Sequence, residues 1–290
     1  MIVGHQKQWN FLKQAATLGL LSHAYLFAGP SKLGKKTIAL KWLSLILNYP
    51  LEERRHPDLI LIEPQNNVIQ ISQIRDLIWK LKLSPHSTSF KTAIIDQAHL
   101  MGIEAQNALL KTLEEPKGNV LLILITQFPE NFLPTIISRC EILKFHLVPK
   151  AEIKGFLENQ GLSTKEAEDL ATISQGRPGI AIDFLLNPQK LESQKKIINK
   201  LIKISNSPLI IRFQYAKDLS QEKSLEEILE IWLSYLRKIL LAKINKSPGF
   251  EGYSFAKLKN TLSVLERTRF LITTTNVNSK LALEILMLNF

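Results

Sequence analysis

The sequence predicts an α/β protein in which a parallel five-stranded sheet is followed by a region built only of helices. Over the first 146 residues, short apolar runs of strand length alternate with segments whose apolar residues recur at helical spacing. A glycine-containing loop at residues 29–36 lies between the first such run and a helical pattern. From about Leu147 onward the strand signals disappear and only helical patterns remain.

The predicted strands are separated by predicted helices, which is the pattern of right-handed crossovers in a parallel sheet. The strands are expected at residues 24–27, 59–62, 92–96, 121–125 and 142–145. The intervening helices are expected at 37–47, 71–81 and 103–113, the last of which stops before Pro116. In such a sheet ligands bind beyond the carboxyl ends of the strands, so a functional site is expected at that edge.

The rest of the chain predicts two helical regions. Three short helices at 151–160, 164–174 and 178–186 indicate a small bundle, and Asn187-Pro188 indicates a linker after it. Longer helices follow at 190–204, 208–219, 224–244, 255–272 and 279–288. We therefore expect three domains, at residues 1–146, 147–188 and 189–290. The helix 224–244 has more apolar residues than one amphipathic face needs, which predicts that some of them are buried against partner proteins.

The composition is typical of a globular protein and excludes several classes of site. Of the 290 residues, 45% are hydrophobic and 22% are charged. No apolar run approaches the roughly 18 residues of a membrane helix, and the polar N-terminus is atypical of a signal peptide. The single cysteine, Cys140, excludes an internal disulfide and a multi-cysteine zinc site. We expect a cytoplasmic protein that has no membrane partner.

The chain is basic, with a formal net charge of +11. From Lys190 onward there are 17 lysines and arginines against nine acidic residues, so most of the excess lies in the last third. A basic excess raises the affinity for polyanions, and direct contact with DNA is one interpretation. A solvated, lysine-rich helical surface is the other.

The loop at residues 29–36 nearly matches the phosphate-binding pattern G-x-x-x-x-G-K-[ST]. Gly29, Gly34 and Lys35 occupy the two glycine positions and the lysine position. In a working loop of this kind, backbone N–H groups hold the phosphates and the final hydroxyl holds Mg²⁺. Lys36 stands at the hydroxyl position, so a cation replaces a metal ligand. The pattern therefore predicts a degenerate loop.

A second degenerate motif falls at the end of the third predicted strand. Asp96 stands where nucleotide hydrolases place the carboxylate that holds Mg²⁺, and Gln97 stands where they place the glutamate that activates water. Glutamine can orient water but cannot accept its proton. Thr126, at the end of the fourth strand, is either a sensor of the γ-phosphate or an ordinary strand-end threonine. The histidines show no metal-like spacing, and no metal site is expected.

Two longer motifs resemble signatures of the bacterial clamp-loader ATPases, an AAA+ family. The first is Asn-Ala-Leu-Leu-Lys-Thr-Leu-Glu-Glu-Pro at 107–116, and the second is Leu-Pro-Thr-Ile-Ile-Ser-Arg-Cys at 133–140. The segments 23–27 and 56–58 are similar to the same family, and the resemblance covers residues 1 to about 188. It implies an AAA+ module with a parallel five-stranded sheet, a three-helix lid and an all-α collar that joins subunits in a ring.

Within this family the chain is most similar to the delta-prime branch, because the motor subunits gamma and tau keep the P-loop threonine and the Asp-Glu pair. The segment 174–179 also resembles delta-prime, and Arg177 is either a displaced sensor arginine or a surface residue. The chain departs from the family between residues 48 and 55, which are too short and too poor in cysteine for its zinc module. No cofactor is expected, and ATP binding is expected to be weak or absent.

The resemblance implies a non-hydrolysing stator that supports ATP-driven loading of the sliding clamp onto primed DNA. Its partners would be the gamma/tau and delta subunits, with the clamp and the primed DNA reached through the complex. Arg139 would act as an arginine finger on the ATP of a neighbouring subunit. Its alternative role is structural, as a helix cap or in a pair with Glu141. The competing functions are an ATP-hydrolysing gamma/tau-type motor, and a stand-alone nucleotide kinase or DNA-binding protein.

Overall fold

The computed structural model describes residues 2–49, 56–86, 88–116, 118–222, 224–244, 254–275 and 277–290. The segment expected to lack the zinc module falls largely at 50–55, outside the described residues. The chain divides into two compact units, Met1–Asp183 and Phe184–Phe290. The predicted domain boundaries at residues 146 and 188 stay predictions.

The first unit contains the predicted five-stranded parallel sheet. The strands are β1 (Ala24–Ala28), β2 (Leu59–Ile62), β3 (Lys91–Ile95), β4 (Val120–Thr126) and β5 (Glu141–Lys144). They are ordered β2-β3-β4-β1-β5, and every pair is parallel. All residues of β1, β3 and β4 are buried, which agrees with their nearly continuous apolar sequences because both faces of the sheet are covered.

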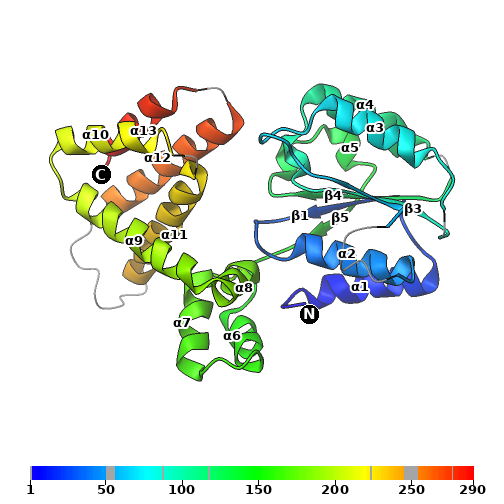
Figure 1. Cartoon of the computed structure of the whole chain (residues 1–290), viewed down its shortest axis with the longest axis horizontal. Coiled ribbons are helices and arrows are strands. Elements are labelled where there is room, and N and C mark those ends of the chain that lie inside the picture. Colours follow the sequence, from blue (N-terminus) through cyan, green and yellow to red (C-terminus); the bar gives the residue numbers. More distant parts are fainter. Residues whose placement is uncertain are drawn as a thin grey trace. The chain divides into compact units, whose positions relative to one another are not determined.

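Helices cover the two faces of this sheet (Figure 1). On one face lie α1 (Gln6–Leu18) and α2 (Lys35–Ile46), and on the other lie α3 (Ile71–Leu81), α4 (Ile103–Glu114) and the short α5 (Pro134–Ile137). The sequence did not predict α1, because only Leu12 and Ala15 of that helix are buried and no side chain caps its N-terminus. The helix α2 begins two residues earlier than predicted, so Lys35 and Lys36 form its first turn.

The predicted three-helix bundle follows as α6 (Lys150–Asn159), α7 (Thr164–Ser174) and α8 (Pro178–Leu186). A capping box between Ser163 and Glu166 begins α7. The predicted linker at Asn187-Pro188 is not a separate segment. Pro188 is the first residue of the next helix, a position where the N–H that proline lacks would have no helical partner.

The second unit is all helical, as predicted. It consists of α9 (Pro188–Ser205), α10 (Leu209–Leu219), α11 (Leu225–Ile244), α12 (Phe255–Thr274) and α13 (Ser279–Leu288). The sequence predicted that part of the apolar surface of α11 is buried against partner proteins, and this stays a prediction. Seven of its residues are buried within this unit, around Trp232, because α11 packs against both α9 and α12.

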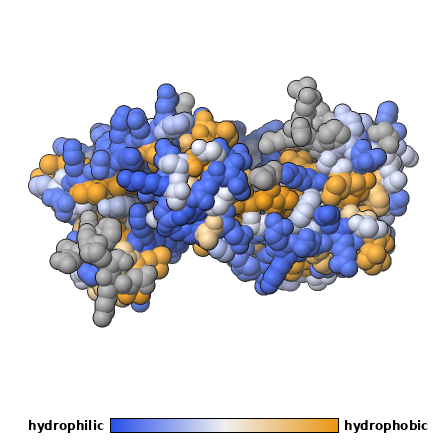
Figure 2. All heavy atoms as spheres, turned by 90° about the horizontal axis from the view of Figure 1, so that it is seen from below, coloured by the Kyte–Doolittle hydropathy of each residue, from blue (hydrophilic) through white to orange (hydrophobic). Residues whose placement is uncertain are grey.

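The surface carries separate apolar patches within a mainly polar face, as Figure 2 shows for one side of the molecule. A stripe of apolar residues also lies on α13, where Leu281, Ile285 and Leu288 are more than half exposed. Their spacing of four and three residues places them on one side of the helix. Among the described residues, no helix has the length and apolarity that crossing a membrane requires.

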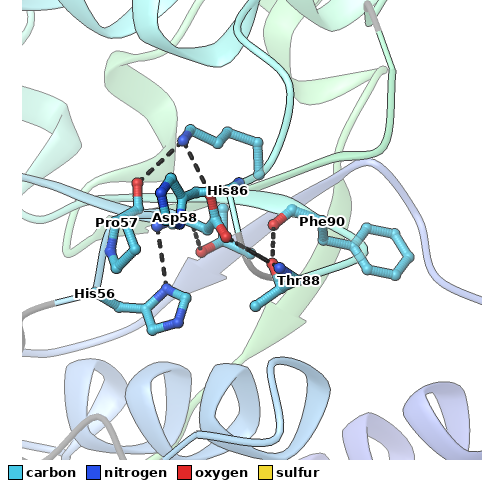
Figure 3. A network of polar contacts seen from close by, with 8 residues as sticks. His56, Pro57, Asp58, His86, Thr88 and Phe90 are labelled. Atoms are coloured by element: carbon cyan, nitrogen blue, oxygen red, sulfur yellow. Dashed lines mark hydrogen bonds and ion pairs between the residues drawn. The ribbon is translucent and has the colours of Figure 1, made fainter.

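A buried carboxylate fixes the edge of the sheet at β2 (Figure 3). Asp58 is fully buried directly before β2, and its Oδ1 accepts from the His86 N–H at 2.7 Å and pairs with Lys91 Nζ at 3.0 Å. Its Oδ2 accepts from the N–H and the hydroxyl of Thr88, and its carbonyl accepts from the hydroxyl of Thr92. This network joins β2, β3 and the loop between α3 and β3 in one arrangement.

We expect Asp58→Ala to lower the free energy of unfolding by about 3–5 kcal/mol, because it leaves the Lys91 ammonium buried without its carboxylate. Urea unfolding of the full chain measures this loss. The control is Asp76→Ala, which removes an exposed carboxylate on α3 and should change the stability by less than about 0.5 kcal/mol. Equal stabilities of the two variants would contradict the role given to Asp58.

Candidate nucleotide-binding site

The carboxyl ends of the parallel strands bring most of the predicted site residues together. The glycine-containing loop leaves β1 and enters α2, as the sequence predicted. Gly29 has φ +147°, and a Cβ atom there would lie 2.2 Å from the carbonyl oxygen of Phe145, so the residue that follows β5 approaches too closely for any side chain. Gly34 is left-handed at the N-cap of α2. The backbone of a phosphate-binding loop is therefore present.

Lys35 is turned inward onto its own loop. Its ammonium donates to the carbonyl oxygens of Gly29 and Pro30, the latter at 2.6 Å. Burial lowers the pKa of Lys35 from its ordinary 10.5 to about 8; the charge of Asp96 opposes this shift, and that of Arg177 adds to it. The lysine that would contact phosphates is thus held by carbonyl groups of the same chain.

Lys36 lies between two carboxylates. Its ammonium is 3.0 Å from Asp96 Oδ2 and also pairs with Glu63, which directly follows β2. The P-loop position that should offer a metal ligand therefore carries a cation, and that cation is bonded to the aspartate that should hold Mg²⁺. A positive charge there disfavours a divalent cation by repulsion and competes for its carboxylate. These residues do not fit a Mg²⁺ ion.

Gln97 and Thr126 complete the predicted set. Gln97 is exposed and left-handed, and its N–H donates to Asp96 Oδ1 at 3.0 Å. Thr126 is buried, its hydroxyl accepts from the N–H of Phe128 at 3.0 Å, and its carbonyl accepts from the N–H of Gly29. These bonds favour a structural role for Thr126, while the sensor role stays a prediction.

His99, which the sequence gave no role, lies beside this set. Burial and the charge of Lys35 lower its pKa from 6.5 to about 4, against the opposing effect of Asp96. It is therefore neutral at physiological pH, and its ring meets Phe128 edge-on. In the described part of the chain, no group of three or more His, Cys, Asp or Glu side chains could hold a metal ion.

The N-terminus of α8 lies directly on the phosphate-binding loop. The N–H of Gly179 donates to the carbonyl of Lys32 at 2.8 Å, and a Cβ atom on Gly179 would lie 2.8 Å from the same oxygen. The ammonium of Lys32 also pairs with Asp183 at 2.8 Å. Glycine is needed at position 179 for this approach. The helix holds the loop closed through contacts that the sequence did not reveal.

Arg139 lies away from all of these residues, at the opposite edge of the sheet. It precedes β5, whose first residue, Glu141, is opposite Tyr25 near the start of β1. Arg139 Nη1 donates to the carbonyl of Thr135 at 2.9 Å, and Nη2 pairs with Glu114 Oε1 at 2.8 Å. Of the two structural alternatives, the described contacts do not include the pair with Glu141, whereas the bond to the Thr135 carbonyl in α5 is a contact of the helix-cap kind. Burial raises the pKa of the neighbouring Cys140 thiol to about 12, which argues against a nucleophilic role.

Gln106 was missed by sequence reasoning, because a glutamine within an amphipathic helix has no distinctive local signal. It is buried on α4, and its amide donates to the carbonyls of Met101 and Asn131, both at 3.1 Å. Its Oε1 accepts from the N–H of Leu133 at 2.9 Å. The start of α4 is thereby tied to the segment that leads into α5 and Arg139.

Comparisons with known proteins identify relatives of this chain. Residues 4–149 match the family model described as DNA polymerase III, delta subunit. The delta' subunit of DNA polymerase III from Bacillus subtilis is 30% identical over 92% of this chain and 91% of its own length. The tau subunit from the same organism is 31% identical over 87% of this chain, and the delta' subunit from Pseudomonas aeruginosa is 35% identical over 41%. The chain spans 51% of that tau subunit and 42% of that delta' subunit.

Solved structures show the same fold. A DNA polymerase III gamma subunit-related protein from Thermotoga maritima superimposes with a TM-score of 0.52 at 20% identity, over 96% of this chain and 97% of that one. A RuvB variant from Thermotoga maritima gives a TM-score of 0.52 at 17% identity, over 96% and 87% of the two chains. At these identities the likeness concerns the fold alone.

We expect Lys36→Ala to lower the free energy of unfolding by about 1–2 kcal/mol, because Asp96 and Glu63 then share a site without a cation. Millimolar Mn²⁺ should raise the thermal midpoint of this variant and leave that of the parent unchanged, since the freed carboxylates are suitable ligands. Thermal unfolding with and without Mn²⁺ measures both effects.

The control is Lys41→Ala, on the same helix, whose side chain forms no ion pair in the described part of the chain. It should respond to Mn²⁺ as the parent does. A Lys36→Ala variant that is as stable as the parent and indifferent to Mn²⁺ would show that Lys36 does not act as a resident cation.

Proposed function

The chain belongs to the DNA polymerase III clamp-loader family, and we propose that within it this chain is a subunit that does not hydrolyse ATP. Its work would be that of a stator in the complex that loads the sliding clamp onto primed DNA. The contact of Lys36 with Asp96 carries the proposal, because it sets a resident cation against the carboxylate that a hydrolase needs for Mg²⁺.

Three further features of the same edge support the absence of hydrolysis. Gln97 cannot accept a proton from an attacking water. The ammonium of Lys35 is bonded to two carbonyl groups of its own loop. The backbone bond from Gly179 to Lys32 closes the loop with α8. We infer that ATP binding is weak or absent and that this chain needs no cofactor of its own.

The alternative is an ATP-hydrolysing motor subunit of the gamma/tau type. The glycines and Lys35 of the loop favour it, and a tau subunit resembles this chain as closely in sequence as a delta' subunit does. Sequence identity does not distinguish a stator from a motor subunit. The distinction therefore depends on the side chains at the carboxyl edge of the sheet. Lys36 and Gln97 replace two groups with separate chemical tasks, and both would have to be dispensable in a motor.

The second unit supports assembly with other subunits. Its own core already buries most of α11, so any contact with a partner must use residues that remain outside that core. The stripe of Leu281, Ile285 and Leu288 on α13 is such a surface, because it leaves three large apolar side chains exposed in one row. The partners on this proposal are the gamma/tau and delta subunits, with the sliding clamp and primed DNA contacted through the complex.

Arg139 is proposed to serve the ATP site of a neighbouring motor subunit. It lies at the amino edge of the sheet, whereas this chain's own phosphate-binding loop leaves the carboxyl edge. An always-charged, planar guanidinium can offset the charge that develops on a γ-phosphate, and a finger supplied in trans can contribute about 10³–10⁵ in rate. Arg139 cannot act on its own loop from the opposite edge, so a trans role fits its position.

We expect the purified chain to show no ATPase activity above background, with or without primed DNA. The measurement is phosphate release at saturating Mg²⁺-ATP, and the matched control is Lys35→Ala. Turnover that is present in the parent and lost in Lys35→Ala would establish this chain as a hydrolase and favour the motor alternative. Equal background in both would leave the stator role standing.

We expect Arg139→Ala to fold and to assemble with the motor and delta subunits, yet to slow the hydrolysis of ATP by the complex. The fall should be partial, because one finger serves one of several sites, and clamp loading should fall further. Arg139→Lys should rescue poorly, since an ammonium lacks the bidentate fork. Steady-state ATPase and clamp-loading assays of reconstituted complexes measure both effects; an assembled Arg139→Ala complex with unchanged activities would refute the trans role.

A further inference from the structure

We propose that Glu114 is the positioning residue of Arg139, so that the carboxylate at the end of α4 sets the orientation in which the guanidinium is presented. The proposal rests on the trans role given to Arg139 above and adds a second residue to it. The pair also links the two motifs by which the sequence resembles its family, since Glu114 lies in the first and Arg139 in the second.

Two anchors from different elements hold the guanidinium. Nη1 donates to the carbonyl of Thr135 in α5 at 2.9 Å, with the hydroxyl of Ser138 at 3.4 Å, and Nη2 pairs with Glu114 Oε1 at 2.8 Å. A planar group fixed at two of its nitrogens has a defined plane and direction. Among these anchors in the described residues, only Glu114 carries a charge, and only Glu114 lies outside the segment 133–140.

The anchors leave part of the guanidinium available. A guanidinium has five N–H donors, and the contacts above leave Nε–H and one N–H of Nη2 without a partner in the described chain. Donors of this kind bind the oxygens of a phosphate. The side chain of Arg139 is 34% exposed, so it can meet a group from another subunit.

The position of Glu114 is not explained by the stability of this chain. It is the last residue of α4, where the negative end of the helix dipole disfavours a carboxylate. Glu115 follows it and is also exposed, and its side chain forms no hydrogen bond or ion pair among the described residues. A half-exposed ion pair contributes little to folding. We therefore infer that the pair holds the long side chain of Arg139 in one orientation. This lowers the conformational entropy that Arg139 must lose when it binds the nucleotide of the neighbouring subunit.

The test uses complexes reconstituted with the full chain as parent, Glu114→Ala, Glu114→Gln, Glu115→Ala, Arg139→Ala and the double variant Glu114→Ala/Arg139→Ala. The Arg139-dependent rate is the difference in ATP turnover between parent and Arg139→Ala. We expect Glu114→Ala to lose more than about half of that rate with an unchanged KM for ATP, because the ground-state nucleotide is held by the neighbour. Glu114→Gln should lose less, and Glu115→Ala should match the parent.

The double variant should be no slower than Arg139→Ala alone, since Glu114 acts through Arg139. If Arg139→Ala leaves the rate unchanged, the trans role itself fails. If Arg139→Ala slows hydrolysis while Glu114→Ala behaves like Glu115→Ala, the trans role stands and the inference about Glu114 fails alone. A faster Glu114→Ala complex, a further loss in the double variant, or failure of Glu114→Gln to assemble would each overturn it.

Discussion

The ammonium of Lys36 pairs with carboxylates that follow two strands of the sheet, and the proposed absence of ATP hydrolysis depends on these pairs. Asp96 follows β3, Glu63 follows β2, and Lys36 lies in the first turn of the helix that follows β1. Two carboxylates at the edge of a parallel sheet repel each other unless a cation lies between them. In a hydrolase, a metal ion that binds with the nucleotide supplies this positive charge. In this chain the positive charge belongs to a lysine side chain.

Several other features of the same edge are consistent with a site that needs no ligand to be complete. The ammonium of Lys35 donates to two carbonyl groups of its own loop. Gly179 permits α8 to approach the loop closely enough for a backbone hydrogen bond. Each contact contributes little stability on its own, but all of them hold the same short loop. On our proposal they fix the conformation of the stator without a nucleotide.

The parallel sheet separates this closed site from Arg139. Because parallel strands run in one direction, a residue before β5 and a loop after β1 lie at opposite edges, and no side-chain movement brings them together. The helix α4 spans the interval: Gln106 near its start bonds to the segment before α5, and Glu114 at its end pairs with Arg139. The helix α4 thus contacts the segment before α5 at one end and Arg139 at the other.

The sequence by itself predicted the parallel sheet, the helical second half and most of the element order, and it placed Lys36 and Gln97 at motif positions, because each of these depends on local periodicity or on a residue type at a fixed motif position. It did not determine α1, whose buried residues are too few to give a clear period, or the burial of α11, which depends on neighbouring helices. Only the tertiary structure decided the partners of the charged residues. Lys36 and Glu63 are 27 residues apart, and Lys32 and Asp183 are 151 apart. Pairs at such separations have no local signature, since they form only after the strands are ordered and the helices packed, and they are the contacts that decide which functions this fold can perform.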